Sequence, residues 1–182
     1  MSHTQVRLAV VIGSVRPERF GPTVANWFVG ETRHRDDVRV DLVDLAADST
    51  GSQSPGLAHR LAAAEAFVVV TPEYNHSYPA ALKNMIDSQG REFHAKPVAF
   101  VSYGGLSGGL RAVEHLRPVF AELHAVTTRD TVSFHGAWKQ FDGAGQPKDP
   151  AAPAAAAGRL LDQLTWWARA LRAAKASSPY PA

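Results

Sequence analysis

The sequence predicts a doubly wound α/β fold, in which five parallel strands are covered by helices on both faces. Two observations support this. Short apolar runs, rich in Val, Ala and Phe, alternate with helical segments along the chain, and continuous runs of this kind are typical of strands buried on both faces. The connections between them are short, as expected where crossover helices join strands into a parallel sheet.

Five apolar runs are expected to form the strands. Most of them are continuous stretches of about five residues in which Val, Ala and Phe predominate. In chain order they are Val6–Ile12, Val38–Val43, Ala66–Thr71, Pro97–Ser102 and Ala125–Thr131.

The intervening segments are expected to be helices. The first, Pro22–Thr32, opens with a proline, which the first turn of a helix tolerates because no N–H is needed there. The last, Ala152–Ala176, carries an apolar stripe close to the i, i+3, i+4, i+7 spacing. The other three are Pro55–Glu65, Ala80–Gln89 and Gly109–Leu123.

We expect the strand order 2-1-3-4-5, because it places the loops after the first and third strands together, where the direction of winding reverses and ligands bind. The length of 182 residues suits one domain, residues 1–182, and no internal repeat is present. Residues 177–182 are expected to fray beyond the last helix.

The composition excludes several classes of function. Lys and Arg total 19 against 17 Asp and Glu, and no basic run is dense enough to follow a phosphate backbone, so nucleic-acid binding is not expected. No stretch of about 18 apolar residues is present to span a membrane. Met1–Gln5 shows no signal pattern, so a cytoplasmic protein is expected. The chain has no cysteine and no His-x-x-x-His pair, so no metal site is expected.

The loop after the first strand is a candidate phosphate site. It is polar, is bounded by Gly13 and Gly21, and leads into a helix. Free N–H groups and the dipole at a helix N-terminus favour an anion, and an arginine adds a bidentate fork. The glycine spacing fits neither a Walker A loop nor Gly-x-Gly-x-x-Gly. The candidate phosphate-binding residues are Ser14, Arg16, Arg19, Pro22, Thr23 and Val24.

The most informative segment is Thr71–Asp87, a polar and aromatic loop between a buried strand and a helix. Such a loop builds a ligand crevice at the carboxyl end of a parallel sheet. The segment resembles the flavin-ring loop of the NADPH-dependent FMN reductase family, the flavodoxin-like quinone, chromate and azo reductases. The resemblance is carried by Pro72, Glu73, Tyr74, Asn75, Pro79, Leu82, Lys83, Asn84 and Asp87.

The first loop is similar to the Gly-Ser-x-Arg phosphate loop of the same family. Many members carry a second Ser and an Asn where this chain has Arg19 to Thr23, so the second half of the loop departs from the family pattern.

The resemblance implies a flavodoxin-like fold, bound FMN, and NADPH or NADH as the electron donor. It places the flavin ring against Pro72, Glu73, Tyr74 and Asn75, with the turn Ser102, Tyr103, Gly104 and Gly105 beside the pyrimidine side of the ring. His76 and Tyr78 are candidates for the substrate side. No catalytic side chain is expected, because the cofactor carries the redox chemistry.

The implied reaction passes a hydride from NAD(P)H to FMN, and then electrons to a quinone, azo compound, metal oxyanion or free flavin, by a ping-pong mechanism. An exposed flavin would leak electrons to oxygen, so a second subunit is expected to wall the site. A homodimer or a dimer of dimers follows, with contacts expected from Leu82, Met85, Ile86 and the segment Arg111–Arg117.

Two alternatives remain open. A non-catalytic flavodoxin would also bind FMN, although flavodoxins are usually strongly acidic and this chain has a net charge of +2. Residues 105–109 satisfy the Gly-x-Ser-x-Gly pattern of serine hydrolases, with Ser107 as nucleophile, Asp130 or Asp142, and His135. Against the hydrolase, Tyr103 and Gly104 intervene between the expected strand and this pattern.

Overall fold

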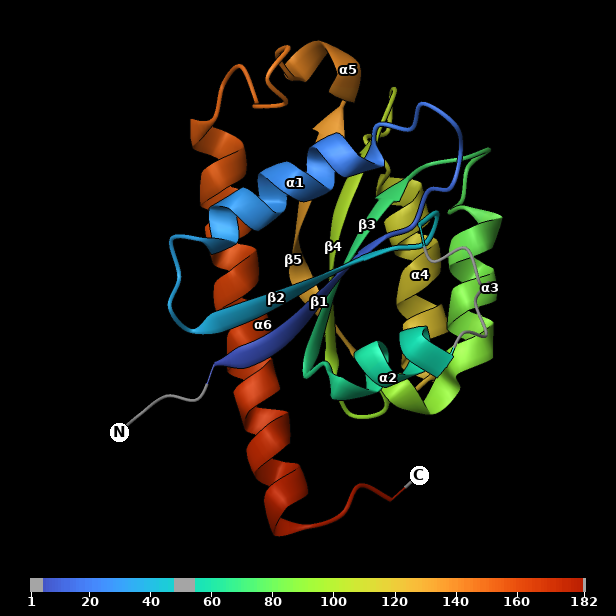
Figure 1. Ribbon diagram of the computed structural model, residues 1–182, viewed down its shortest axis with the longest axis vertical. Coiled ribbons are helices and arrows are strands. Elements are labelled where there is room, and N and C mark those ends of the chain that lie inside the picture. The colour runs from blue at the N-terminus through green and yellow to red at the C-terminus, as the bar shows by residue number, and fades with distance from the viewer. Residues whose placement is uncertain (1–4, 48–54, 182) are drawn as a thin grey trace.

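The computed structural model describes residues 5–47 and 55–181. Five strands form one parallel sheet in the order β2-β1-β3-β4-β5 (Figure 1). The predicted doubly wound fold and strand order are therefore confirmed. The strands are β1 (Val6–Ile12), β2 (Val38–Asp44), β3 (Ala66–Pro72), β4 (Pro97–Gly104) and β5 (Val126–His135).

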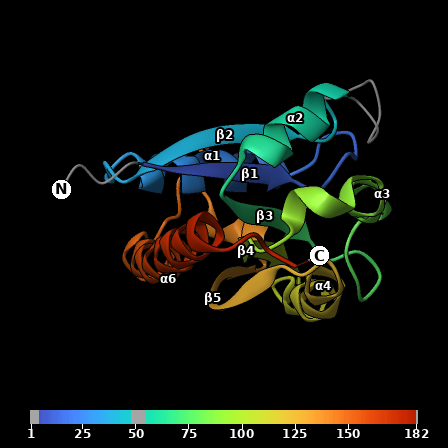
Figure 2. The ribbon, with the colours of Figure 1, turned by 90° about the horizontal axis from the view of Figure 1, so that it is seen from below.

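Helices cover both faces of the sheet. Helices α1 and α6 lie on one face, and α2, α3 and α4 lie on the other (Figure 2). None of the described helices combines the length and apolar composition needed to cross a membrane. The helices are α1 (Gly21–Thr32), α2 (Pro55–Ala63), α3 (Ala80–Gln89), α4 (Leu110–Glu122), α5 (Ala137–Gln140) and α6 (Ala151–Ser177), with a 3-10 turn at Gly90–Phe93.

Each face of the sheet has its own apolar core, because successive strand residues point to opposite faces. In β1, Val10 packs with the α1 and α6 side, whereas Val11 packs with the α2, α3 and α4 side. Trp27 and Phe134 meet edge to face in the first core, with ring centroids 5.0 Å apart. Burial on both faces explains why the central strands are continuous apolar runs in the sequence.

Strand β5 is longer than predicted. It continues to His135, paired with Gly104 of β4, whereas the sequence indicated an end at Thr131. Beyond Thr131, buried Val132 and Phe134 alternate with more exposed polar residues, as in an edge strand with one covered face. Helix α5, which follows β5, was not predicted.

The end of the chain is only partly free. Helix α6 ends at Ser177, close to the predicted Ala176, but the following residues fold back. The Tyr180 hydroxyl lies 3.1 Å from Nδ1 of His124, and their rings pack edge to face. Residues 1–4, where no signal pattern was expected, and residue 182 of the expected frayed end lie outside the described residues.

Candidate functional site

The loops after β1, β3 and β4 meet at the carboxyl edge of the sheet, at the upper right of Figure 1. Hydrogen bonds hold them at fixed separations. The N–H of Gly13 donates to the Val70 carbonyl at 2.9 Å, and the N–H of Glu73 donates to the Tyr103 carbonyl at 3.3 Å. β1 and β3 are neighbours, so this edge includes the switch point of the sheet, where ligands of doubly wound folds bind.

The β1–α1 loop, residues 13–20, is suited to bind an anion. Among the described residues, no acceptor is found for the backbone N–H groups of Ser14, Val15 and Arg16. No described carboxylate forms an ion pair with Arg16 either. The loop runs into the N-terminus of α1, which adds a partial positive charge. Unpaired donors and an uncompensated cation are the features that recognise a phosphate group.

A buried phenol lies beside the start of α1. The Tyr103 hydroxyl is buried without a partner among the described residues. Burial, followed by the neighbouring Tyr74 phenol, raises the pKa of Tyr103 above its ordinary value, so the hydroxyl stays protonated. A Cβ atom at Gly21 would lie 2.9 Å from this hydroxyl. The start of α1 can therefore lie close to the Tyr103 hydroxyl because residue 21 is glycine.

Tyr74 links the first loop to the third. Its hydroxyl lies 2.5 Å from Oγ of fully buried Ser14. The guanidinium of Arg16 lies over its ring, 3.6 Å from the centroid. Two of the predicted phosphate residues therefore contact a predicted ring residue, so the two candidate loops lie against each other.

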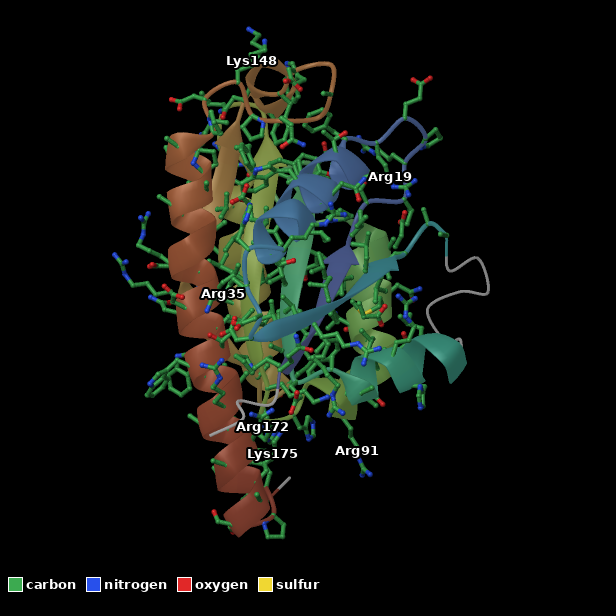
Figure 3. All side chains as sticks on the ribbon, turned by 60° about the vertical axis from the view of Figure 1, so that its left-hand side comes forward. Arg19, Arg35, Arg91, Lys148, Arg172 and Lys175 are labelled. Carbon is green, nitrogen blue, oxygen red and sulfur yellow. The ribbon has the colours of Figure 1, made fainter. Side chains whose placement is uncertain are left out.

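The other predicted residues of the first loop have different surroundings. Arg19 forms an ion pair with Asp44 at the end of β2, with 2.5 Å between Nη2 and Oδ2, so its charge is compensated within the chain. Its position is shown in Figure 3. Val24 is fully buried and its N–H already donates to the Phe20 carbonyl at 3.3 Å, whereas Pro22 and Thr23 are partly exposed at the helix start.

The β3–α3 loop contains a tight turn over residues 74–77. Tyr74 and Ser77 exchange two backbone hydrogen bonds, and both central residues have positive φ, 50° at Asn75 and 74° at His76. This is the type I′ geometry. Asn75 and His76 are exposed at the tip, while Pro72 is buried at the end of β3. Tyr78 is partly buried and packs against the core on the side of α2, α3 and α4.

The side chains of the β4–α4 turn point inward. Ser102 is buried and donates to the Gly108 carbonyl at 2.8 Å. The side chain of Tyr103 belongs to the α1 and α6 core. A Cβ at Gly104 would lie 3.3 Å from the backbone N of Gly109, so the space beside Gly104 is already filled by the backbone of the same turn. At this turn, only backbone groups and Gly105 remain as candidates to face a ring.

A carboxylate network connects the third and fourth loops, and the sequence did not predict it. The Glu73 carboxylate accepts a hydrogen bond from the Ser107 hydroxyl and another, at 2.8 Å, from Nη1 of Arg111. Partial burial raises the pKa of Glu73, but the two hydrogen bonds outweigh this and hold the pKa below its ordinary value. In the sequence, only the i, i+4 spacing of Arg111 and His115 indicated that both side chains lie on one face of a helix and could contact the same loop.

The same network disfavours the serine hydrolase alternative. Ser107 donates to a carboxylate, whereas His135 contacts Ser133 and the Leu106 carbonyl. Positive φ occurs at Gly108 and Gly109, not at Ser107. Ser107 is therefore neither activated by a histidine nor placed on the strained turn that a nucleophile elbow requires.

The surface also has hollows at the opposite edge of the sheet, near the amino ends of β1 and β2. Two adjoining hollows share Arg7 and Arg39. Nearby cations are paired, since Arg172 contacts Glu65 at 3.2 Å. Arg91, Arg172 and Lys175 lie at this end, far from Arg19 (Figure 3). Doubly wound sheets bind ligands at their carboxyl edge, so that edge, rather than these hollows, is the candidate site. No cluster of His, Asp or Glu in the described residues could hold a metal ion.

One expectation about subunit contacts is wrong. Leu82, Met85 and Ile86 were expected to meet a second subunit, but they are at most 1% exposed and pack in the core of their own chain. They follow the apolar spacing of a helix that covers its own sheet. The exposed apolar side chains at this edge instead include Leu106, at 90% exposure, and Trp138, at 62%.

Comparisons with known proteins identify the family. The model of the NADPH-dependent FMN reductase family matches residues 6–139. An NAD(P)H-dependent FMN reductase of Schizosaccharomyces pombe is 40% identical over 123 residues, 57% of this chain and 60% of that protein, so this chain spans less than two thirds of that relative. A quinone reductase of Escherichia coli is 41% identical over 137 residues, 67% of this chain and 73% of that protein.

Solved structures show the same fold. FerB, a flavoenzyme NAD(P)H:(acceptor) oxidoreductase from Paracoccus denitrificans, superposes with a TM-score of 0.70 at 20% identity, over 91% of this chain and 98% of that one. A Fusobacterium nucleatum flavodoxin bound to flavin mononucleotide superposes with a TM-score of 0.58 at 10% identity, over 90% of this chain and 97% of that one.

Proposed function

The chain belongs to the NADPH-dependent FMN reductase family, and on this premise we propose that it is an FMN-dependent oxidoreductase with NAD(P)H as its electron donor. The observation that carries the proposal is the set of backbone N–H groups of the β1–α1 loop for which the described residues offer no acceptor, in a loop joined to the β3–α3 loop through Ser14 and Tyr74. A phosphate and an attached ring system need these two features side by side.

The residues divide the work of holding FMN. Arg16, Thr23 and the free N–H groups of the β1–α1 loop would bind the phosphate, with the Tyr103 hydroxyl as a further donor. Peptide groups at Glu73, Tyr74 and Asn75 would meet the ring edge, and the chain at Gly104 and Gly105 would border its other side. Arg19 would act through Asp44 to fix the loop rather than contact the phosphate directly.

Bound FMN would supply the redox chemistry, taking a hydride from NAD(P)H and passing electrons to an acceptor in a ping-pong cycle. The protein's part is to bind, orient and shield. Exposed Asn75 and His76 line the open side, where the donor and then the acceptor would bind. We propose a quinone as the leading acceptor, with azo compounds, metal oxyanions and free flavin as further candidates.

A second subunit would complete the wall of this open side. Leu106, Leu110 and Trp138 are the exposed apolar residues around the β4–α4 and β5–α5 turns. Because they lie at the candidate site, a homodimer or a dimer of dimers that covers them would also limit the access of oxygen. The ion pair Lys83–Asp87 on α3 stays at the surface and is not part of this wall.

The proposal is tested by adding NADPH or NADH to the purified, FMN-loaded protein without oxygen and following the visible absorbance of the flavin. We expect the absorbance to bleach without any other enzyme, and to return when a quinone is added. Parallel double-reciprocal plots would support the ping-pong order.

Two results would change the assignment. Bound flavin that bleaches only after another reductase is added would identify a flavodoxin-type carrier. A protein that retains no FMN at any concentration would overturn the proposed function. Loss of the bleaching in a denatured sample serves as the control.

A further inference from the structure

Glu73 joins two loops through its side chain as well as its backbone. It is the first residue after β3, and its carboxylate is only 10% exposed. The two donors come from different elements: Ser107 from the β4–α4 turn, and Arg111 from the first turn of α4, with 2.8 Å between Nη1 and Oε1. These residues are 34 and 38 positions from Glu73 in the sequence, so only the fold brings them together.

Helix α4 holds the β3–α3 loop at a second point. His115, one turn after Arg111, lies with Nδ1 3.0 Å from Oγ of Ser77. The two contacts bracket the turn at residues 74–77, which carries the proposed contacts to the ring. A Cβ at Gly104 would lie 3.8 Å from Cβ of Glu73, so the two loops are already in close approach.

The environment of Glu73 differs from that of a solvated surface pair. Its carboxylate receives two side-chain donors and is largely removed from water, which makes the interactions stronger than those of exposed pairs. On the same helix, Glu114 and Arg117 form an exposed i, i+3 pair in which Glu114 is 71% exposed. That pair provides a matched comparison.

We propose that Glu73, Ser107 and Arg111 are positioning residues that set the spacing of the two loops around the flavin, and that the balance of charge between Glu73 and Arg111 sets the reduction potential of bound FMN. This inference rests on the proposed function. A lone carboxylate beside the flavin would disfavour the addition of electrons, and a lone guanidinium would favour it, because unlike charges attract over short distances in a partly dry site.

The test compares Glu73→Gln, Arg111→Gln and Ser107→Ala with the control Glu114→Gln. We expect Glu73→Gln to shift the FMN potential to more positive values and Arg111→Gln to shift it to more negative values. Both should weaken FMN binding about tenfold, since each leaves a partly buried charged or polar group without its partner. Ser107→Ala should weaken binding less, and Glu114→Gln should change neither quantity.

Potential shifts of opposite sign in Glu73→Gln and Arg111→Gln indicate an effect of charge. A loosened fold would instead shift the potential of both variants in the same direction. Potential shifts of the same sign, or FMN binding unchanged in both variants, would overturn the inference. If a variant fails to fold, Arg111→Lys keeps the charge, and we expect it to restore the potential although it replaces the planar guanidinium by an ammonium group.

A measurement on the apoprotein separates this inference from the proposed function. The unfolding midpoints of Glu73→Gln, Arg111→Gln and the double variant form a cycle. We expect the unfolding midpoint of the double variant to fall by less than the sum of the decreases in the two single variants. A parent protein that binds no FMN overturns the proposed function, and this assignment with it. A parent that binds FMN, with an additive cycle in the apoprotein, overturns this assignment alone.

Discussion

Lys96 shows how one residue can make the stability of this protein depend on pH. Its ammonium group donates to the carbonyls of Leu61 and Ala62, at 3.1 and 2.9 Å, at the C-terminal end of α2. Burial, and then the charge of Lys175, lowers its pKa from 10.5 to about 8. The folded protein thus gives up this proton more readily than the unfolded chain.

The sign follows from linkage. Between pH 8 and pH 10.5 the unfolded chain binds more protons at Lys96 than the folded protein does. The contribution of Lys96 to the free energy of unfolding therefore rises with pH over this range, and it is lost as the pH falls through 8. Relative to Lys96→Met, the free energy of unfolding should rise by up to about 3 kcal/mol across this range. Urea unfolding at several pH values measures it. Exposed Lys148, labelled in Figure 3, is the control: Lys148→Met should run parallel to the parent. Parallel curves for Lys96→Met would contradict the prediction.

Among the elements, the turn between β4 and α4 is the most tightly built. Gly109 has φ of 88°, and a Cβ there would lie 2.7 Å from Cβ of Ser102 and 2.9 Å from the N of Tyr103. We predict that Gly109→Ala lowers the free energy of unfolding by about 2–4 kcal/mol, because the left-handed conformation and the clash both oppose a side chain.

Gly158 is the control for this substitution. It lies inside α6, and a Cβ there would meet nothing within 4 Å. Gly158→Ala should therefore raise the free energy of unfolding by about 0.5–1 kcal/mol, because alanine favours a helix over glycine. Thermal or urea unfolding of both variants measures the contrast. Equal effects at the two positions would show that the turn tolerates a side chain.

For the whole molecule, FMN binding and folding should be linked. A ligand at about 100 times its Kd stabilises a protein by about 2.7 kcal/mol, which corresponds to a rise in Tm of about 5–10 °C for a domain of this size. Arg16→Ala should weaken FMN binding about 30- to 100-fold, because it removes a charged hydrogen-bond fork to the phosphate. At the same FMN concentration the variant should lose most of the rise in Tm.

Arg33→Ala is the matched control, since Arg33 is an exposed arginine at the other end of α1. It should retain the full rise in Tm. Riboflavin, which lacks the phosphate, should stabilise the parent less than FMN does. If Arg16→Ala and the parent show the same rise, the phosphate does not bind at this loop.

The order of the sheet was determined by the sequence itself, which also predicts the position of the site. Buried parallel strands carry their signal locally, as continuous apolar runs such as Ala66–Val70, and the polar loops that follow them must meet at one edge. The end of β5 and the short helix α5 were not predicted. The edge strand alternates buried Val132 and Phe134 with polar residues, so it lacks the continuous apolar run of a central strand.

The direction of each side chain was decided only by the tertiary structure. Ser102 and Tyr103, predicted beside the flavin, have buried side chains, which the sequence did not indicate, and Leu82 proved to be core rather than interface. Glu73 acquired its partners from Ser107 and Arg111, which are remote in the chain. Local patterns specify which segments form strands, helices and loops, whereas contacts between distant loops depend on strand register and helix packing, which form only when the whole chain is folded.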